Sequence, residues 1–111
     1  MEPETIPELL PGTLYMLILR TVAHRPLHGY AIARRIKEAS ENGLDIQDGS
    51  LYPALNRMLV KGWLAAEWGI SENNRRARFY RLTREGQKRL AAETKDFETL
   101  IRNIQLVMRS V

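Results

Sequence analysis

The chain contains no cysteine, so it forms no disulfide bond and has no thiolate for catalysis or metal binding. Its two histidines, His24 and His28, lack the cysteine or carboxylate partners of a zinc site, so we expect no metal and no cofactor. No apolar run reaches the roughly 18 residues that span a bilayer. The acidic start, Met1–Glu4, differs from the basic start of a secretory signal. These absences predict a cytoplasmic protein that does not enter a membrane.

Signatures of catalysis are also missing. The acidic residues are scattered and form no evident pair for general acid–base chemistry. The sequence has neither a glycine-rich phosphate loop nor the strand–turn–helix motif that presents a nucleophilic serine. We therefore do not expect an enzyme.

What the chain does have is a local cluster of positive charge. With 111 residues, 44% of them hydrophobic and 27% charged, it suits one small globular domain. The formal net charge of +4 is moderate, but four arginines fall within seven residues, at Arg75, Arg76, Arg78 and Arg81. A concentrated basic segment indicates a polyanionic partner better than net charge does.

Apolar spacing predicts three helices in the first half of the chain. Residues 1–10 are rich in proline and are interpreted as an N-terminal tail. The first helix is expected over Thr13–Ala23, and the second begins near His28 and ends at Asn42–Gly43. Between the second and third helices, Leu44–Ile46 is expected to be extended, with a single-bridge strand as one option.

The third helix is expected over Leu51–Lys61. Proline has no amide hydrogen and is best tolerated in the first helical turn, so Pro53 places the start of the helix near Gly49–Ser50. Ser50 is then the predicted N-cap.

Two strands and a long helix complete the pattern. The strands are expected over Trp63–Ile70 and Arg78–Leu82, joined by a short polar connection, with Trp63, Trp68 and Tyr80 in the core. Thr83 is the predicted N-cap of a helix over 84–111. Apolar residues recur in this helix at the spacing of a coiled-coil seam, which predicts dimerisation through this helix and the first helix, unless the stripe packs onto its own domain. The predicted dimerisation residues are Leu90, Phe97, Leu100, Ile101, Ile104, Val107 and Met108.

The predicted fold is mainly α with a small β-hairpin: a winged helix-turn-helix domain over 11–83 and a long C-terminal dimerisation helix over 84–111. In this order of elements, four sequence blocks resemble the PadR family of bacterial transcriptional regulators. The resemblance covers about residues 9–90. The blocks are residues 28–32 (HGYAI), 49–55 (GSLYPAL), 62–64 (GWL) and 78–83 (RFYRLT) followed by Gly86.

The resemblance implies a homodimer that represses transcription and belongs to the short subfamily with a single C-terminal helix. It also implies that a small aromatic compound is a candidate effector. Where effector-binding relatives place tryptophans at the dimer seam, this helix has Phe97, which argues against a flat pocket for aromatic drugs.

The third helix is the expected reader of DNA. An α-helix fits the major groove, where Arg57 would contact guanine and Asn56 adenine. Ser50 and Tyr52 would hold phosphates. The alternative is an ordinary amphipathic helix with a solvated polar face.

Further contacts are expected from the hairpin tip and the second helix. Asn74, Arg75 and Arg76 would reach the minor groove or the phosphates, unless the tip is polar only for solubility. Arg34 and Arg35 would contact the DNA backbone, unless they are merely a solvated helix face.

The sequence therefore predicts a regulator that binds a palindromic operator in double-stranded DNA as a homodimer. Two alternatives remain. In a protein-interaction module, the last helix would pair with a different protein. A non-specific architectural DNA binder would be expected to carry a larger positive charge and would not need Asn56 and Arg57.

Overall fold

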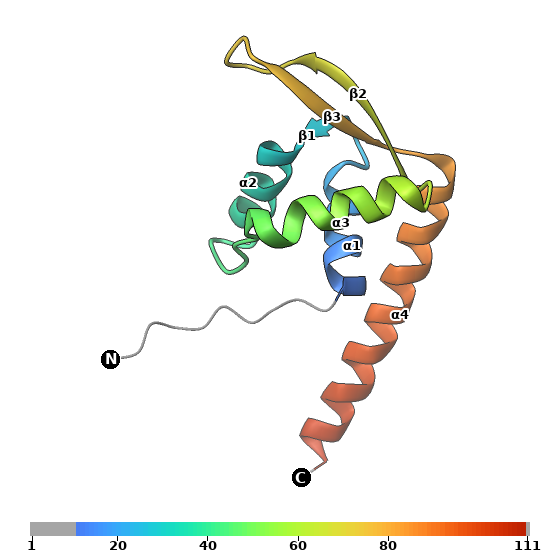
Figure 1. The fold of residues 1–111 in the computed structure, drawn as a ribbon. Coiled ribbons are helices and arrows are strands. Elements are labelled where there is room, and N and C mark those ends of the chain that lie inside the picture. Colours follow the sequence, from blue (N-terminus) through green and yellow to red (C-terminus); the bar gives the residue numbers. More distant parts are fainter. Residues whose placement is uncertain (1–10, 111) are drawn as a thin grey trace.

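A computed structural model describes residues 11–110 of the chain. The expected tail over 1–10 and the last residue of the expected C-terminal helix, Val111, lie outside this range. Four helices and a small antiparallel sheet follow one another along the chain, as expected (Figure 1). They are α1 (Pro11–Thr21), β1 (Leu27–His28), α2 (Gly29–Ala39), α3 (Asp48–Val60), β2 (Leu64–Ile70), β3 (Arg76–Leu82) and α4 (Arg84–Arg109).

The core lies where α1, α2 and α3 meet the base of the sheet. Each helix contributes side chains three or four residues apart, such as Leu14 and Ile18 from α1 or Leu51 and Leu55 from α3, and these are almost entirely buried. Tyr80 and Leu64 close the core from the sheet. The polar sides of α2 and α3 are thereby left facing solvent.

The sheet has three strands in the order β1-β3-β2. The third strand, β1, was not expected: Leu27 pairs with Tyr80, and His28 pairs with Phe79. A two-residue strand is too short to show an alternating pattern, although Leu27 is buried. The option of a strand at Leu44–Ile46 is wrong, since this segment joins no sheet.

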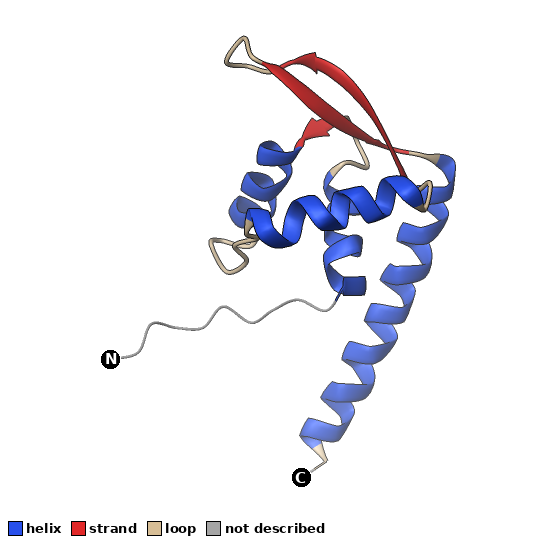
Figure 2. Ribbon diagram, viewed as in Figure 1, coloured by secondary structure: helices blue, strands red, loops and turns tan. Residues whose placement is uncertain are grey.

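The hairpin of β2 and β3 extends beyond the helices (Figure 2). Near its base, Leu64 pairs with Leu82 and Ala66 with Tyr80, and this face packs on the helical core. Trp68 lies on the same face but is 61% exposed, so its expected place in the core is wrong. Alternation identified the face correctly, but it does not show where the underlying helices end.

The start of α3 also differs from expectation. The helix begins at Asp48 and its N-cap is Gln47, which makes no side-chain capping bond, so Ser50 is not the N-cap. Pro53 is the sixth helical residue counted from Asp48 and removes an amide partner from the Gly49 carbonyl. Gly49 and Pro53 are both exposed, so water can donate a hydrogen bond to the Gly49 carbonyl. This lowers the free-energy cost of starting the helix at Asp48.

The beginning of α4 is held firmly against the sheet. As expected, Thr83 is the N-cap: its hydroxyl accepts from the Gly86 amide at 2.9 Å and donates to the Gly62 carbonyl at 2.6 Å. A Cβ atom on Gly86 would lie 2.1 Å from the Trp63 carbonyl oxygen, so only glycine fits there. The helix then runs away from the body (Figure 1). Within residues 11–110, neither α4 nor any other helix is long and apolar enough for a membrane span.

Candidate DNA-binding surface

The outer face of α3 is exposed along its length. Its buried side chains, Leu51, Ala54, Leu55 and Met58, occupy one side of the helix. At about 100° per residue, Asn56 and Val60 lie opposite that side. The exposed residues of the helix are Asp48, Gly49, Ser50, Tyr52, Pro53, Asn56, Arg57 and Val60.

Tyr52 is fixed against the start of α2. A Cβ atom on Gly29 would lie 2.8 Å from the Tyr52 ring, so the ring rests directly on the α2 backbone. Burial raises the pKa of Tyr52 above its ordinary value of 10.0, and the charges of Asp48 and Tyr80 raise it further. At neutral pH the hydroxyl is therefore protonated and can donate a hydrogen bond, while 41% of the residue stays exposed.

Arg57 lies on the flank of α3 that faces α1. Its Nε donates a hydrogen bond to the Tyr15 hydroxyl at 2.7 Å, and its guanidinium carbon lies 5.7 Å from the centre of the Tyr15 ring. Tyr15 itself is buried in the core. The structure thus attaches Arg57 to the scaffold, whereas Asn56 points directly outward.

The hairpin tip is a tight, polar turn. The Ser71 amide donates to the Arg75 carbonyl at 2.8 Å, and Asn74 adopts the left-handed conformation with φ of 58°. Asparagine tolerates this conformation better than most residues. Asn74, Arg75 and Arg76 are all exposed at or beside the tip.

The hairpin of β2 and β3 is here called the wing. Two further residues of the wing, Trp68 and Arg78, were not among the expected contacts. The guanidinium carbon of Arg76 lies 4.5 Å from the Trp68 ring centre. Arg78 pairs with Trp68 across the strands and lies 5.8 Å from the Tyr80 ring. The signal in the sequence was the alternation that puts Trp68, Arg76 and Arg78 on one face.

On α2, Arg34 and Arg35 are both exposed, and Arg34 also contacts the hairpin tip. Arg34 pairs with Glu38 at 3.8 Å and with Glu72 of the hairpin tip at 3.7 Å. Its guanidinium carbon also lies 5.6 Å from the centre of the Tyr30 ring. Arg34 therefore connects α2 to the tip of the wing.

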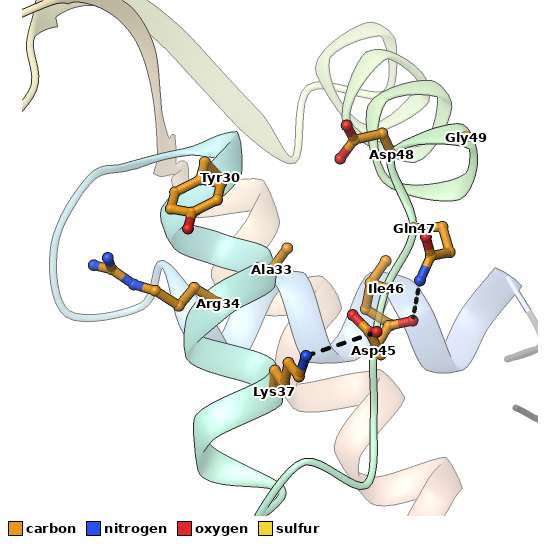
Figure 3. Close-up of a pocket in the computed structure, with 9 residues that line it drawn as sticks. All are labelled: Tyr30, Ala33, Arg34, Lys37, Asp45, Ile46, Gln47, Asp48 and Gly49. Atoms are coloured by element: carbon orange, nitrogen blue, oxygen red, sulfur yellow. Dashed lines mark hydrogen bonds and ion pairs between the residues drawn. The ribbon is translucent and has the colours of Figure 1, made fainter.

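An open groove of about 560 Å³ separates α2 from the segment that leads into α3 (Figure 3). Tyr30 and Arg34 line it from α2, opposite Asp48 and Gly49. Lys37 pairs with Asp45 at 3.8 Å along its lower part. With two cations and two carboxylates, the groove has no strong preference for ligand charge.

Trp63 joins α1, α4 and the end of α3. Its ring meets Tyr15 edge-on with centres 5.4 Å apart. The Arg89 guanidinium of α4 lies 4.8 Å from the same ring, and Arg89 also forms an ion pair with Glu93. Because Tyr15 holds Arg57, a continuous set of contacts runs from α4 to α3.

The apolar seam of α4 divides into two parts. Leu90 packs against the core, and Ile101 is half-buried. The remaining seam residues are exposed despite their size. Their exposed fractions are 39% for Phe97, 54% for Leu100, 47% for Ile104, 63% for Val107 and 73% for Met108.

Comparisons with known proteins agree with this architecture. A protein of Mycobacterium tuberculosis named as a transcriptional regulator is 32% identical over 87 residues, which cover 78% of each chain. The structure of a PadR family transcriptional regulator from Eggerthella lenta matches with 29% identity and a TM-score of 0.74, covering 90% of this chain and 85% of that one.

A PadR family transcription regulator from Clostridium difficile matches with 25% identity and a TM-score of 0.74, covering 86% of this chain and 97% of the other. The model of the transcriptional regulator PadR-like family matches residues 18–92. Members of that family are regulators rather than enzymes. The resemblance seen in the sequence is confirmed, and the chain belongs to the PadR-like family of DNA-binding transcriptional regulators.

Proposed function

We propose that the protein is a homodimeric repressor that binds a palindromic operator. The observation that carries this proposal is the exposed apolar stripe on the outer half of α4, from Phe97 to Met108. A contiguous exposed apolar surface at coiled-coil spacing is stabilised by burial against another helix. A second copy of α4 presents a matching stripe, and two-fold pairing of this kind leads to a two-fold operator.

In this proposal α3 enters the major groove. Asn56 would form paired hydrogen bonds with adenine, since it lies opposite the buried side of the helix. Arg57 would contact guanine through its terminal nitrogens while its Nε remains bonded to Tyr15. Ser50, in the first turn, and the protonated hydroxyl of Tyr52 would bind backbone phosphates.

The wing and α2 would add contacts to the DNA backbone. Asn74, Arg75 and Arg76 at the tip are exposed and able to reach phosphates or a narrow minor groove. Arg34 and Arg35 would contact phosphates beside the recognition helix. The ion pairs of Arg34 are no obstacle, because its partners Glu38 and Glu72 are 68% and 80% exposed and surface pairs are weak.

Repression would follow from occupancy of the operator, and a small aromatic compound is a candidate inducer. The groove of about 490 Å³ between α1 and α4, with Leu82 and Leu90 in its lining, would hold such a compound. A melting-temperature screen of aromatic compounds, with and without operator DNA, tests this part alone. A compound that acts as an inducer should raise the melting temperature of the free protein and release the DNA.

The central experiment compares two duplexes at physiological salt. One carries the palindrome found by footprinting upstream of the gene for this protein, and the other carries the same bases scrambled. We expect the palindrome to be preferred by at least about 10³-fold, with one dimer bound per site. Equal affinity for both duplexes would reject sequence-specific repression.

Oligomeric state decides between this proposal and a protein-interaction module. Light scattering at micromolar concentration should give twice the mass of the chain. A stable monomer would instead favour the module, whose α4 pairs with a different protein.

A further inference from the structure

Trp68 occupies an unusual place for a tryptophan. It is 61% exposed on β2, and the nearby Ile70 is 64% exposed. Large apolar side chains exposed together on a small protein often mark a contact surface. The strand register places Trp68 opposite Arg78 and Ile70 opposite Arg76. These four residues, Trp68, Ile70, Arg76 and Arg78, are here called the wing face.

The wing face is continuous with the outer side of α3. Near the base of the hairpin, Tyr80 lies on the same side of the sheet, and the Tyr52 ring of α3 rests on Gly29, directly after β1, which pairs with β3. The guanidinium carbon of Arg78 lies 5.8 Å from the Tyr80 ring, one step further along the hairpin. A duplex lying against α3 would therefore continue along the wing face.

The formal charge of the wing face is positive. Arg76 and Arg78 carry the only formal charges of the wing face, and the acidic residue of β2, Glu67, pairs with Phe79 on the other side of the sheet. At the tip, Glu72 is engaged by Arg34. An apolar ring between guanidinium groups suits a partner with both phosphates and apolar sugar edges, which is the backbone of DNA.

We propose that the wing face is a specificity-determining DNA contact in which Trp68 packs against the deoxyribose backbone beside the half-site. The inference rests on the proposed function and extends it. Arg76, held 4.5 Å over the Trp68 ring, and Arg78 contact the phosphates on either side. Because the ring is rigid, it selects backbone geometry and so reads the width of the minor groove. The indole N–H would donate to a phosphate oxygen.

Fluorescence tests the position of Trp68 directly. The chain has two tryptophans, and Trp63→Phe leaves Trp68 as the only reporter. Adding the operator duplex should change the Trp68 emission and protect it from acrylamide, with the same midpoint as DNA binding. Trp68→Phe leaves Trp63 as the reporter, whose emission should stay constant. If Trp63→Phe does not fold, the difference between the wild type and Trp68→Phe provides the same signal.

Affinity provides the second measurement. Trp68→Ala should weaken operator binding by about tenfold, the effect expected for one aromatic and cation–π contact, and Trp68→Phe should retain most of the affinity. Leu106→Ala is the matched control, since Leu106 is 53% exposed on α4 and far from the wing in sequence, and it should bind as the wild type. Thermal melting confirms that each variant is folded.

The outcomes separate the inference from the function on which it rests. Two results would overturn the inference alone. In one, the wild-type protein binds the operator while Trp68 stays accessible to acrylamide. In the other, Trp68→Ala binds the operator as tightly as the wild type. Absence of operator binding by the wild type would overturn the proposed function. Emission from Trp68 that depends on protein concentration without DNA would show that a second copy covers the wing face, which also overturns the inference.

Discussion

Two parts of the molecule, the wing and the outer half of α4, extend beyond its packed body and differ in chemistry. The wing presents arginines beside one exposed tryptophan. The outer half of α4 presents apolar side chains on one side of a helix. Both are amphipathic, but a basic strand pair attracts a polyanion, whereas an apolar helical stripe is stabilised by burial against another helix. This difference is the basis for our proposal that one projection contacts DNA and the other a second copy of the chain.

The largest expected effect comes from Ile104→Asp. A carboxylate in the middle of the seam would be buried by dimerisation, so the variant should be monomeric. Losing the second half-site should weaken operator binding by about 100-fold or more. Sedimentation and gel shift measure the two effects.

Leu106→Asp is the matched control for Ile104→Asp. Leu106 is exposed to a similar degree, 53% against 47%, but lies about 200° around the helix from Ile104. This variant should remain dimeric and bind DNA normally. If both variants were dimeric, the interface would lie elsewhere. The outer half of α4 would then not be the surface that binds a second copy of the chain.

Gly86→Ala should cause the next largest change, in stability. The added methyl group meets the backbone oxygen of Trp63, which cannot move as a flexible side chain would. We expect a loss of about 3 kcal/mol in the free energy of unfolding, measured by urea denaturation. Gly49→Ala is the control: no atom lies within 4 Å of the new Cβ, so it should stabilise the helix by up to about 1 kcal/mol. Equal effects of the two changes would contradict the close contact at Gly86.

Replacing Arg75 and Arg76 together with alanine should affect DNA binding without affecting the dimer. Each lost phosphate contact lowers the slope of log affinity against log salt by about 1, so the slope should fall by about 2. Titrations at several salt concentrations measure it, with light scattering to verify the dimer. An unchanged slope would remove these two arginines from the interface.

Tyr15→Phe should have the smallest effect. It removes the hydroxyl that holds the Arg57 Nε and should cost about 1 kcal/mol of stability. Operator affinity should fall by a few-fold because Arg57 is less firmly directed. In the double variant with Arg57→Ala the two effects should not add, whereas full additivity would show that the hydrogen bond is irrelevant to DNA binding.

Much of the fold could be predicted because local rules govern it. Thr83 was identifiable as an N-cap from its side chain and position, and His28 was correctly interpreted as a residue at the start of α2, where it accepts a hydrogen bond from the Ala31 amide. The helical spacing of Leu51, Leu55 and Met58 is equally local. Such features need only neighbours along the chain.

The remaining features depend on contacts between distant residues. The hydrogen bond from Arg57 to Tyr15 joins positions 42 residues apart, so Arg57 could not be distinguished from a freely solvated arginine. The exposure of Trp68 follows from where α2 and α3 end beneath the hairpin, and the pairing of Leu27 with Tyr80 depends on tertiary packing. The periodicity of apolar residues along the chain carries no information about contacts between residues that are distant in the sequence.

Only Thr83 separates β3, which ends at Leu82, from α4, which begins at Arg84. The 26-residue helix is therefore a rod of about 39 Å continuous with the base of the wing, without a flexible joint. In a dimer held at the far ends of two such helices, their crossing angle would set the separation of the two DNA-binding domains. Inserting one residue into α4 between Leu90 and Phe97 would turn each DNA-binding domain by about 100° relative to the seam and require an operator of different spacing.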